Sequence, residues 1–349
     1  MDTVEFSRTV PRELVHRLSV AEVLVTGAVA RDEDTLDVGT QIPRSHAFYR
    51  DTAGCRHLYD PMVLVEAARQ TLIMLGHELF DMPFGTKFIL REIALRDADP
   101  TALAVRGVPT EVVLRCHILR RFRGRAGVSG ARLRYTALVG DRVAATLECS
   151  MSWVPPDRWQ AMRDEGRTEL GLAPGLVIDA PEPPPRVGEL LVDRRDPANV
   201  VLSSFRVPPG DRTTGTARLV VDTGHPVLFD HVVDHVPGML TLEAFRQLGI
   251  ATAVATGALP SASALLTGVN ARFTGIGELD LPISCESVLT RTDGTNAVLR
   301  CALRQEGRTV AEGEVCLTAA AEGEKRPAGT GVGKVHLTGI GAGAEAGTR

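Results

Sequence analysis

Two segments of the sequence repeat the same charged pair inside an apolar stretch. The segments are Asp60-Pro-Met-Val-Leu-Val-Glu-Ala-Ala-Arg-Gln70 and Pro237-Gly-Met-Leu-Thr-Leu-Glu-Ala-Phe-Arg-Gln247. At one offset of 177 positions, Glu66 matches Glu243 and Arg69 matches Arg246. A carboxylate can take a proton from a hydroxyl group, and a guanidinium group suits a phosphate. The repeat therefore predicts an internally duplicated chain with a polar site in each half.

The surroundings of each pair favour a functional role over a structural one. The predicted helices are apolar on nearly every face, so a carboxylate within them must have a partner or a raised pKa. An ion pair that only stabilises the helix is the alternative. The pair occurs twice, and each copy follows a loop that contains histidine. We expect function more strongly for Glu243 and Arg246 than for Glu66 and Arg69, and Gln247 follows the stronger pair.

A polar loop leads into the second helix through Pro237-Gly238. It contains His231 and His235, which could act as acid, base or hydrogen-bond donor. Amide groups at the helix start, near Gly238, could polarise a carbonyl oxygen. One of the two histidines could instead brace the turn through a neighbouring aspartate. His57 is a weaker first-half counterpart.

Two further histidines lie in extended segments, each upstream of one repeat. They are His46, in Ser-His-Ala-Phe-Tyr, and His225, in Gly-His-Pro-Val-Leu-Phe. The sequence leaves open whether they contact a ligand or lie satisfied in the core.

The elements around the repeats have the same order in each half. One buried helix is expected from Met62 to about residue 75 and another from Met239 to about residue 256, each followed by several strands. This order matches an α+β double hot-dog fold, in which each antiparallel sheet wraps around a central helix. We expect an N-terminal domain at 1–154, a Pro-rich linker at 155–197 with a short helix near Trp159, a second domain at 198–320 and a disordered tail at 321–349.

Composition excludes several classes of protein. A net charge of −4 argues against a nucleic-acid binder, and no apolar run is long enough to cross a membrane. The N-terminus lacks the features of a signal peptide, and the six scattered cysteines predict reduced thiols in a cytoplasmic protein. No metal-ligand spacing and no phosphate-binding glycine loop occurs, so we expect neither a metal nor a cofactor.

Seven arginines lie between Arg115 and Arg134, including the run Arg120-Arg-Phe-Arg-Gly-Arg125. A solvated hairpin is the simpler interpretation. The alternative is a docking patch for an acidic partner such as acyl carrier protein.

The second repeat resembles the hot-dog β-hydroxyacyl-carrier-protein dehydratases, although its loop is two residues shorter and Arg246 stands where those enzymes are usually apolar. The closer resemblance is to the A-factor biosynthesis (AfsA) family of autoregulator synthases. It covers nearly all of 13–319 and is carried by four motifs. They are Val15-His-Arg with Ala-Glu-Val-Leu-Val-Thr26, Pro43-Arg-Ser-His-Ala-Phe-Tyr49, Asp60-Pro through Glu66-Ala-Ala-Arg-Gln70, and Asp230-His-Val-Val-Asp-His-Val-Pro-Gly-Met-Leu through Glu243-Ala-Phe-Arg-Gln247.

This resemblance implies an acyltransferase. Such enzymes transfer a β-ketoacyl group from an acyl-carrier-protein thioester to the hydroxyl group of dihydroxyacetone phosphate. The product then closes by aldol condensation to a precursor of a γ-butyrolactone-type signalling molecule. The matching positions make Glu243 and Arg246 the main pair, with Glu66 and Arg69 as the first-half pair. No serine or cysteine with a neighbouring base is visible, which favours direct transfer.

Two alternatives remain at this stage. One is an acyl-thioester dehydratase or thioesterase on the same fold, and Arg246 speaks against it because a dry acyl tunnel has little use for a cation. The other is a non-catalytic regulator that binds an acyl or lactone ligand. The sequence leaves open the acyl chain length, the hormone class, the number of active half-sites and whether two copies form a homodimer.

Overall fold

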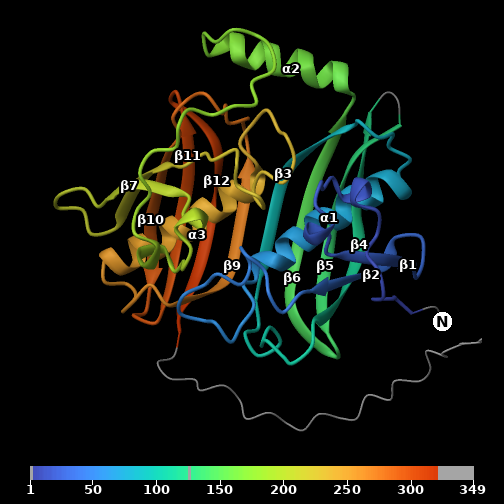
Figure 1. The fold of residues 1–349 in the computed structure, drawn as a ribbon, viewed down its shortest axis with the longest axis horizontal. Helices are drawn as coiled ribbons and strands as arrows, with labels where there is room; N and C mark the ends of the chain where they lie inside the picture. Colours follow the sequence, from blue (N-terminus) through green and yellow to red (C-terminus); the bar gives the residue numbers. More distant parts are fainter. Residues whose placement is uncertain (1–2, 125–126, 321–349) are drawn as a thin grey trace, which may run out of the picture.

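A computed structural model describes residues 3–124 and 127–320, and Figure 1 shows its fold. The tail expected to be disordered and Arg125 of the arginine run lie outside the described residues. Three α-helices occur in the described part: α1 (Met62–Glu78), α2 (Pro156–Glu169) and α3 (Gly238–Ala255). The two buried helices predicted from sequence are α1 and α3.

The strands form one antiparallel sheet of twelve strands, in the order β1-β2-β4-β5-β6-β3-β9-β12-β11-β10-β8-β7. Both halves of this order follow the same pattern when each is traced from its outer edge. The double hot-dog prediction is confirmed, with the two sheets continuous through β3 and β9. The strands are β1 (Val25–Ala30), β2 (Thr35–Ile42), β3 (Lys87–Arg96), β4 (Thr110–Gly124), β5 (Gly127–Val139), β6 (Arg142–Val154), β7 (Leu202–Arg206), β8 (Thr214–Leu219), β9 (Ala264–Phe273), β10 (Ser284–Thr292), β11 (Asn296–Gln305) and β12 (Arg308–Ala319).

The pairing of β3 with β9 defines an approximate twofold axis. Glu92 pairs with Arg272, and Leu95 pairs with Val269. Arg272 lies 177 positions after Leu95, and Val269 lies 177 positions after Glu92. Glu92 therefore pairs with the counterpart of Leu95, and Leu95 pairs with the counterpart of Glu92, as across the interface of a symmetric dimer.

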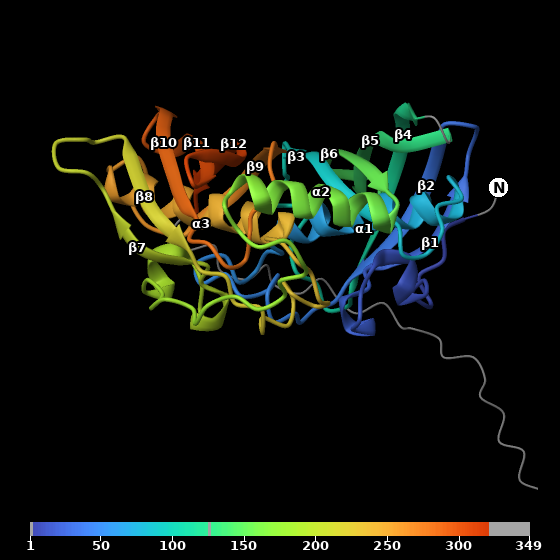
Figure 2. The same ribbon diagram turned by 90° about the horizontal axis from the view of Figure 1, so that it is seen from above.

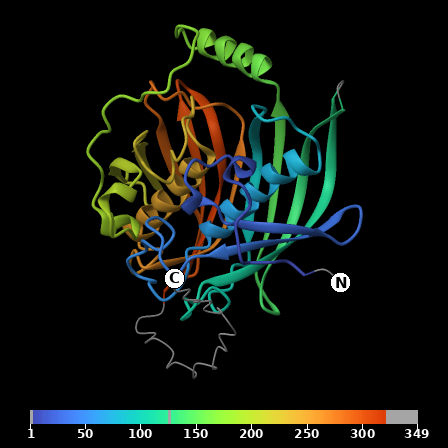
Figure 3. The same ribbon diagram turned by 45° about the vertical axis from the view of Figure 1, so that its right-hand side comes forward.

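The two central helices lie on one side of this sheet. α1 packs on strands of the first half and α3 on strands of the second half. Figure 2 shows both helices along the same face, and in Figure 3 the strands of the first half curve behind α1. Glu66 and Gln70 in α1, like Glu243 and Gln247 in α3, are buried. Sheet and loops therefore cover both helices on nearly every face, polar positions included.

The duplication begins earlier in the second half than the domain boundary at 197 predicted from sequence. The short 3-10 helix Glu189–Val192 lies 177 positions after the 3-10 helix Arg12–Val15, and each ends at a residue in the left-handed region, Asp193 (φ 58°) and His16 (φ 51°). We therefore assign the segment from residue 189 to the second half. The helix expected near Trp159 is α2, which crosses one end of the sheet (Figure 1).

Candidate active site

Each central helix carries a carboxylate that is enclosed by two arginines and a glutamine. Glu66 accepts hydrogen bonds from Arg17 (2.5 Å), Arg69 (2.8 Å) and Gln70 (2.8 Å). Since Arg17 reaches the cluster from outside the helix, the pair seen in the sequence is half of a larger group.

The second cluster repeats the first contact by contact. Glu243 accepts hydrogen bonds from Arg194 (3.0 Å), Arg246 (3.0 Å) and Gln247 (2.5 Å). Arg194 lies 177 positions after Arg17. The two clusters are therefore equivalent in connectivity.

Both clusters bridge the halves. Arg17 donates to the carbonyl oxygen of Val227 at 3.4 Å, and Arg194 donates to that of Phe48 at 2.8 Å. In the same symmetric manner, Asp230 accepts the backbone N–H of Leu18 at 2.7 Å, and Asp51 accepts that of Arg195 at 3.4 Å. Loops of each half are thus tied to the cluster of the other.

The electrostatics of the clusters bear on their chemistry. Burial alone would raise the pKa of Glu243, but Arg194 and Arg246 outweigh burial and lower this pKa to about 2. The pKa of Glu66 is lowered to about 2 in the same way, by Arg17 and Arg69. Both carboxylates therefore stay ionised at neutral pH, and donors from two arginines and a glutamine already occupy the oxygen atoms that would take a proton.

The two clusters differ in their access to open space. A cavity of about 580 Å³ lies between α1, the start of β3, α2 and the loop that enters α3. Arg17 and Arg69 line this cavity, whereas Glu243 and Arg246 do not. The side chain of Arg69 is 15% exposed and that of Arg246 only 2%. The first-half cluster therefore faces the cavity, although the sequence favoured the second-half cluster as the functional one.

The structure brings together only part of the predicted site. His231, His235 and Gly238 line the cavity, while Gln247 lies in the closed cluster. His46 and His225 do not line it. Their Nδ1 atoms accept backbone N–H groups, as in the bonds from Phe48 and Tyr49 to His46 and from Val227 and Leu228 to His225. These two histidines brace equivalent turns in the two halves.

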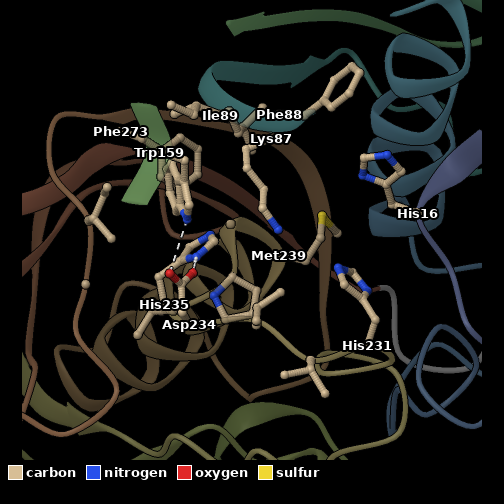
Figure 4. A pocket seen from close by; sticks show the side chains of 18 of the residues that line it. His16, Lys87, Phe88, Ile89, Trp159, His231, Asp234, His235, Met239 and Phe273 are labelled. Atoms are coloured by element: carbon tan, nitrogen blue, oxygen red, sulfur yellow. Dashed lines mark hydrogen bonds and ion pairs between the residues drawn. The ribbon is translucent and has the colours of Figure 1, made fainter. Parts of the chain in front are cut away.

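The cavity wall is rich in cations and histidines. Besides Arg17 and Arg69 it carries Lys87, and Figure 4 shows Lys87, His16 and His231 around one space. Burial, helped by Arg69 and Arg17, lowers the pKa of His231 to about 4. His231 is therefore neutral at physiological pH, and the positive charge in the wall comes from Lys87 and the arginines.

His235 stands on the other side of the cavity with an aspartate behind it. Its Nδ1 lies 2.8 Å from Asp234, which also accepts hydrogen bonds from Trp159 (3.2 Å) and Arg163 (3.1 Å). Figure 4 shows His235 and Asp234 below Trp159. Despite burial, the contacts with His235 and Arg163 keep the pKa of Asp234 well below its ordinary value.

Helix α2 forms part of the cavity through Trp159 and Gln160. It is held by two buried arginines, Arg163 and Arg167, which both pair with Glu278. The link between the halves therefore contributes to the site, although the sequence suggested only a spacer.

The start of α3 approaches the cavity closely because residue 238 is glycine. A Cβ atom at Gly238 would lie 2.8 Å from Cδ2 of Leu90 and 3.3 Å from Cζ of Phe273. The first amides of a helix have no partner within the helix and carry partial positive charge. The role of this end of α3 in stabilising a developing oxyanion stays a prediction, and the close approach to Leu90 and Phe273 places it at the cavity.

The equivalent space in the second half is closed. Asp193 occupies the position of His16 and accepts the backbone N–H groups of Ala53 (3.1 Å) and Gly54 (2.8 Å). Gly54 is so close to Ser263 that a Cβ atom there would lie 2.3 Å from its Oγ. Lys87 of the open half corresponds to Ala264. In the described part of the second half, Asp193 and the Gly54–Ser263 contact fill the position of this space, and the counterpart of Lys87 carries no charge.

Replacement of Asp193 by asparagine is expected to stabilise the protein at high pH only. Burial raises the pKa of Asp193 to about 6, against the attraction of Arg246. The unfolded chain loses this proton near pH 4, so stability falls as the pH rises from about 4 to 6. Asparagine keeps the accepting oxygen and tolerates the left-handed backbone. The expected gain is roughly 2–3 kcal/mol at pH 8 and close to zero at pH 4, measured by urea unfolding. An equal gain at both pH values would contradict this explanation.

The described arginines from Arg115 to Arg134 lie on the paired strands β4 and β5, and most of them have acidic partners. Arg115 pairs with Asp37, Arg121 with Asp34, and both Arg132 and Arg134 with Glu148. These contacts agree with the solvated-hairpin interpretation.

Several residues of the site were missed by sequence reasoning. Arg17 and Arg194 lie in Leu14-Val-His-Arg and Leu191-Val-Asp-Arg, which repeat at the same offset and could have revealed them. Lys87 and Trp159 carry no such signal. Among the described residues, no three His, Cys, Asp or Glu side chains gather as metal ligands would. Within the same ranges, no helix is both long and apolar enough to cross a bilayer.

Comparisons with known proteins agree with this architecture. The family model of the A-factor biosynthesis hotdog domain matches residues 2–155 and 179–321. A protein from Streptomyces virginiae named 2-oxo-3-(phosphooxy)propyl 3-oxoalkanoate synthase is 33% identical over 305 residues, which cover 86% of this chain and 95% of the relative. A protein of the same name from Streptomyces griseus is 31% identical over 300 residues, or 85% and 92% of the two chains.

A solved structure extends the similarity in fold. The dehydratase domain of a mycocerosic acid synthase-like polyketide synthase has a TM-score of 0.51 at 15% sequence identity, covering 86% of this chain and 96% of that domain. At this identity the likeness concerns the fold alone.

Proposed function

This chain belongs to the A-factor biosynthesis hotdog family, and from that premise we propose that it is the acyltransferase that makes a 2-oxo-3-(phosphooxy)propyl 3-oxoalkanoate. The substrates are a β-ketoacyl thioester and dihydroxyacetone phosphate. The observation that carries the proposal is a cavity, lined by described residues, in which a cationic wall meets an apolar one.

The cationic wall suits the phosphate of the acceptor. Arg69 keeps its guanidinium at the cavity while Glu66 fixes its position through two hydrogen bonds of 2.8 Å. Lys87 supplies a second charge from β3. A planar guanidinium and an ammonium group together are well suited to a phosphate dianion. This assigns to Arg69 the phosphate-binding role that the sequence suggested for Arg246.

The apolar wall suits the acyl chain. It is formed by side chains of α1, β3, β6 and β9 and by the start of α3, namely Ile73, Phe88, Leu90, Met151, Met239 and Phe273. Burial of each methylene group of an acyl chain on such a surface contributes about 0.8 kcal/mol. The thioester carbonyl would then lie near Gly238, where the helix amides can stabilise the oxyanion.

The reaction transfers one acyl group directly. The hydroxyl oxygen of the acceptor attacks the thioester carbon, the C–S bond breaks and the hydroxyl proton passes to the enzyme before it reaches the leaving thiolate. The cavity histidines are the candidates for this proton transfer, because both glutamates are enclosed by arginines. The ester then closes by intramolecular aldol condensation to a butenolide or furan precursor of a signalling molecule.

We further propose acyl carrier protein as the donor's carrier and the cytoplasm as the location, because both substrates arise in central metabolism there. Arg120 and Arg123, which are exposed on the arginine hairpin, remain candidates for contacts with an acidic carrier. A homodimer would be compatible with this scheme and is not required by it.

Mass spectrometry of the products tests the function. Purified protein, dihydroxyacetone phosphate and a β-ketoacyl thioester should give the phosphorylated ester. The same reaction without dihydroxyacetone phosphate should leave the thioester intact. Free acid or dehydrated thioester in both reactions, with no ester, would instead indicate a thioesterase or dehydratase, and no turnover at all would favour a binding protein.

A further inference from the structure

A pair of histidines extends from the cavity wall to the end of α1. His16 lines the cavity, and its Nε2 lies 2.9 Å from Nε2 of His77, in the last turn of α1. Nδ1 of His77 lies 2.7 Å from the carbonyl oxygen of Met82. These three groups form a chain that leads from the cavity towards the protein surface.

The chain fixes the position of each proton. A carbonyl oxygen can only accept, so Nδ1 of His77 carries a hydrogen and Nε2 of neutral His77 is an acceptor. Nε2 of His16 must then carry the hydrogen between the two rings. In neutral His16 this leaves a lone pair on Nδ1, which has no hydrogen-bond partner among the described residues.

The ring of His16 is directed at the substrate space. Figure 4 shows it facing the side of the cavity that holds Met239 and His231. An edge-to-face contact with Phe88, at 5.0 Å between ring centroids, holds this orientation. The charged and titratable groups around it are His77 and Arg69 of α1, His231 of the opposite loop and Lys87 of β3.

The fold itself does not require this pair. The counterparts of His16 and His77 at the 177-residue offset are Asp193 and Val254. The second half forms the same backbone around Asp193, including the left-handed residue after the 3-10 helix. The histidines therefore occur only in the half whose cluster borders the cavity.

We infer that His16 accepts the proton of the acceptor hydroxyl at Nδ1 and that His77 receives the proton released from Nε2 of His16. This inference rests on the proposed function. As the hydroxyl oxygen bonds to the thioester carbon, its proton moves to Nδ1 of His16, and the Nε2 proton moves to Nε2 of His77. The positive charge then lies at the C-terminal end of α1, where the helix dipole favours a cation. When the C–S bond breaks, the same steps in reverse deliver a proton to the thiolate.

Kinetics of a glycine variant test the role of His16. Glycine fits the φ of 51° at this position without strain. His16→Gly should lower the single-turnover rate of ester formation by about 100-fold and leave the KM for dihydroxyacetone phosphate nearly unchanged. Added imidazole can occupy the space left by the missing ring and should restore at least a tenth of the lost rate. Glu306→Gly, at another left-handed position (φ 47°) in the exposed turn after β11, is the matched control and should behave like the wild type.

His77→Gln separates a proton-relay role from a structural one. Glutamine can accept the hydrogen bond from His16 but cannot take its proton. We expect a loss of about tenfold in rate at an unchanged KM. In mixtures of light and heavy water, the rate should depend quadratically on the deuterium fraction in the wild type, as expected for two moving protons. In His77→Gln the dependence should be linear, as expected for one. A linear dependence in both proteins would overturn the relay.

Nitrogen NMR of histidine-labelled protein tests the tautomer without any substrate. Nδ1 of His16 should give the resonance of an unprotonated nitrogen, assigned by its loss in His16→Gly. A protonated Nδ1, a wild-type rate in His16→Gly, or a folded variant that imidazole fails to rescue would overturn the inference. If the wild type makes no ester, the proposed function fails, and the NMR result still decides the tautomer.

Discussion

Replacing Arg69 with glutamine is expected to lower kcat/KM for dihydroxyacetone phosphate by about 100-fold or more. Loss of one member of a hydrogen-bonded charge pair at a binding site costs about 2–5 kcal/mol. The protein should remain folded, because Glu66 keeps Arg17 and Gln70 as partners. Arg69→Lys should recover part of the loss, since lysine keeps the charge without the planar fork. Steady-state kinetics with each substrate varied in turn give the measurement.

The comparison between substrates decides the interpretation of that experiment. A phosphate-binding role predicts a loss in the use of the acceptor with little change in binding of the acyl thioester. Arg300→Gln, on the exposed face of β11, is the control and should leave both constants unchanged. Equal losses for both substrates would show that Arg69 supports the cavity rather than the phosphate.

Glu243→Gln should have its main effect on stability. It removes the carboxylate that Arg194 and Arg246, with side chains 0% and 2% exposed, both contact at 2.8 Å. Among the described residues, Arg194 then keeps the more distant Asp60, at 3.8 Å, as its ion-pair partner. Removal of one member of a buried ion pair typically costs 3–5 kcal/mol. Urea unfolding should show a loss of about this size, while the rate per folded molecule stays near that of the wild type.

Glu66→Gln is the matched variant in the first half, and it should affect the rate more than the stability. Arg69 borders the cavity and can be solvated there, so the loss of stability should be smaller. The rate should fall, because Arg69 loses the two bonds that fix it. A Glu243→Gln protein of normal stability with about 100-fold lower turnover would return Glu243 to the role of general base.

The sequence predicted the fold well because the two repeats match at one constant offset of 177 positions. That offset relates Glu66 to Glu243 and also Glu92 to Val269, and it therefore predicts the two helices and the repeated strand order. The seam between the two halves, where β3 pairs with β9, was not predictable in the same way. Strand pairing between distant segments leaves no spacing signal in a single sequence.

The choice between the two half-sites could not be read from the motifs. The loop before α3 has more histidines and the Pro-Gly entry, which favoured Glu243 as the active carboxylate. Those histidines lie in the second half of the sequence, but the loop crosses to the first-half cluster, as the bond from Arg17 to Val227 shows. Which cluster is open depends on the contact of Gly54 with Ser263 and on single substitutions such as Lys87 against Ala264.

The seam between β3 and β9 has a consequence for how such a molecule can change. In a dimer of identical subunits, every mutation enters both sites at once, so a residue needed for chemistry must also be tolerated in every structural role. Fusion into one chain removes that coupling. His16 and Asp193 can then diverge, one half specialising in reactivity while its twin becomes a scaffold. If the proposed function holds, each polypeptide carries one catalytic centre, and the number of active centres equals the number of chains rather than the number of repeats.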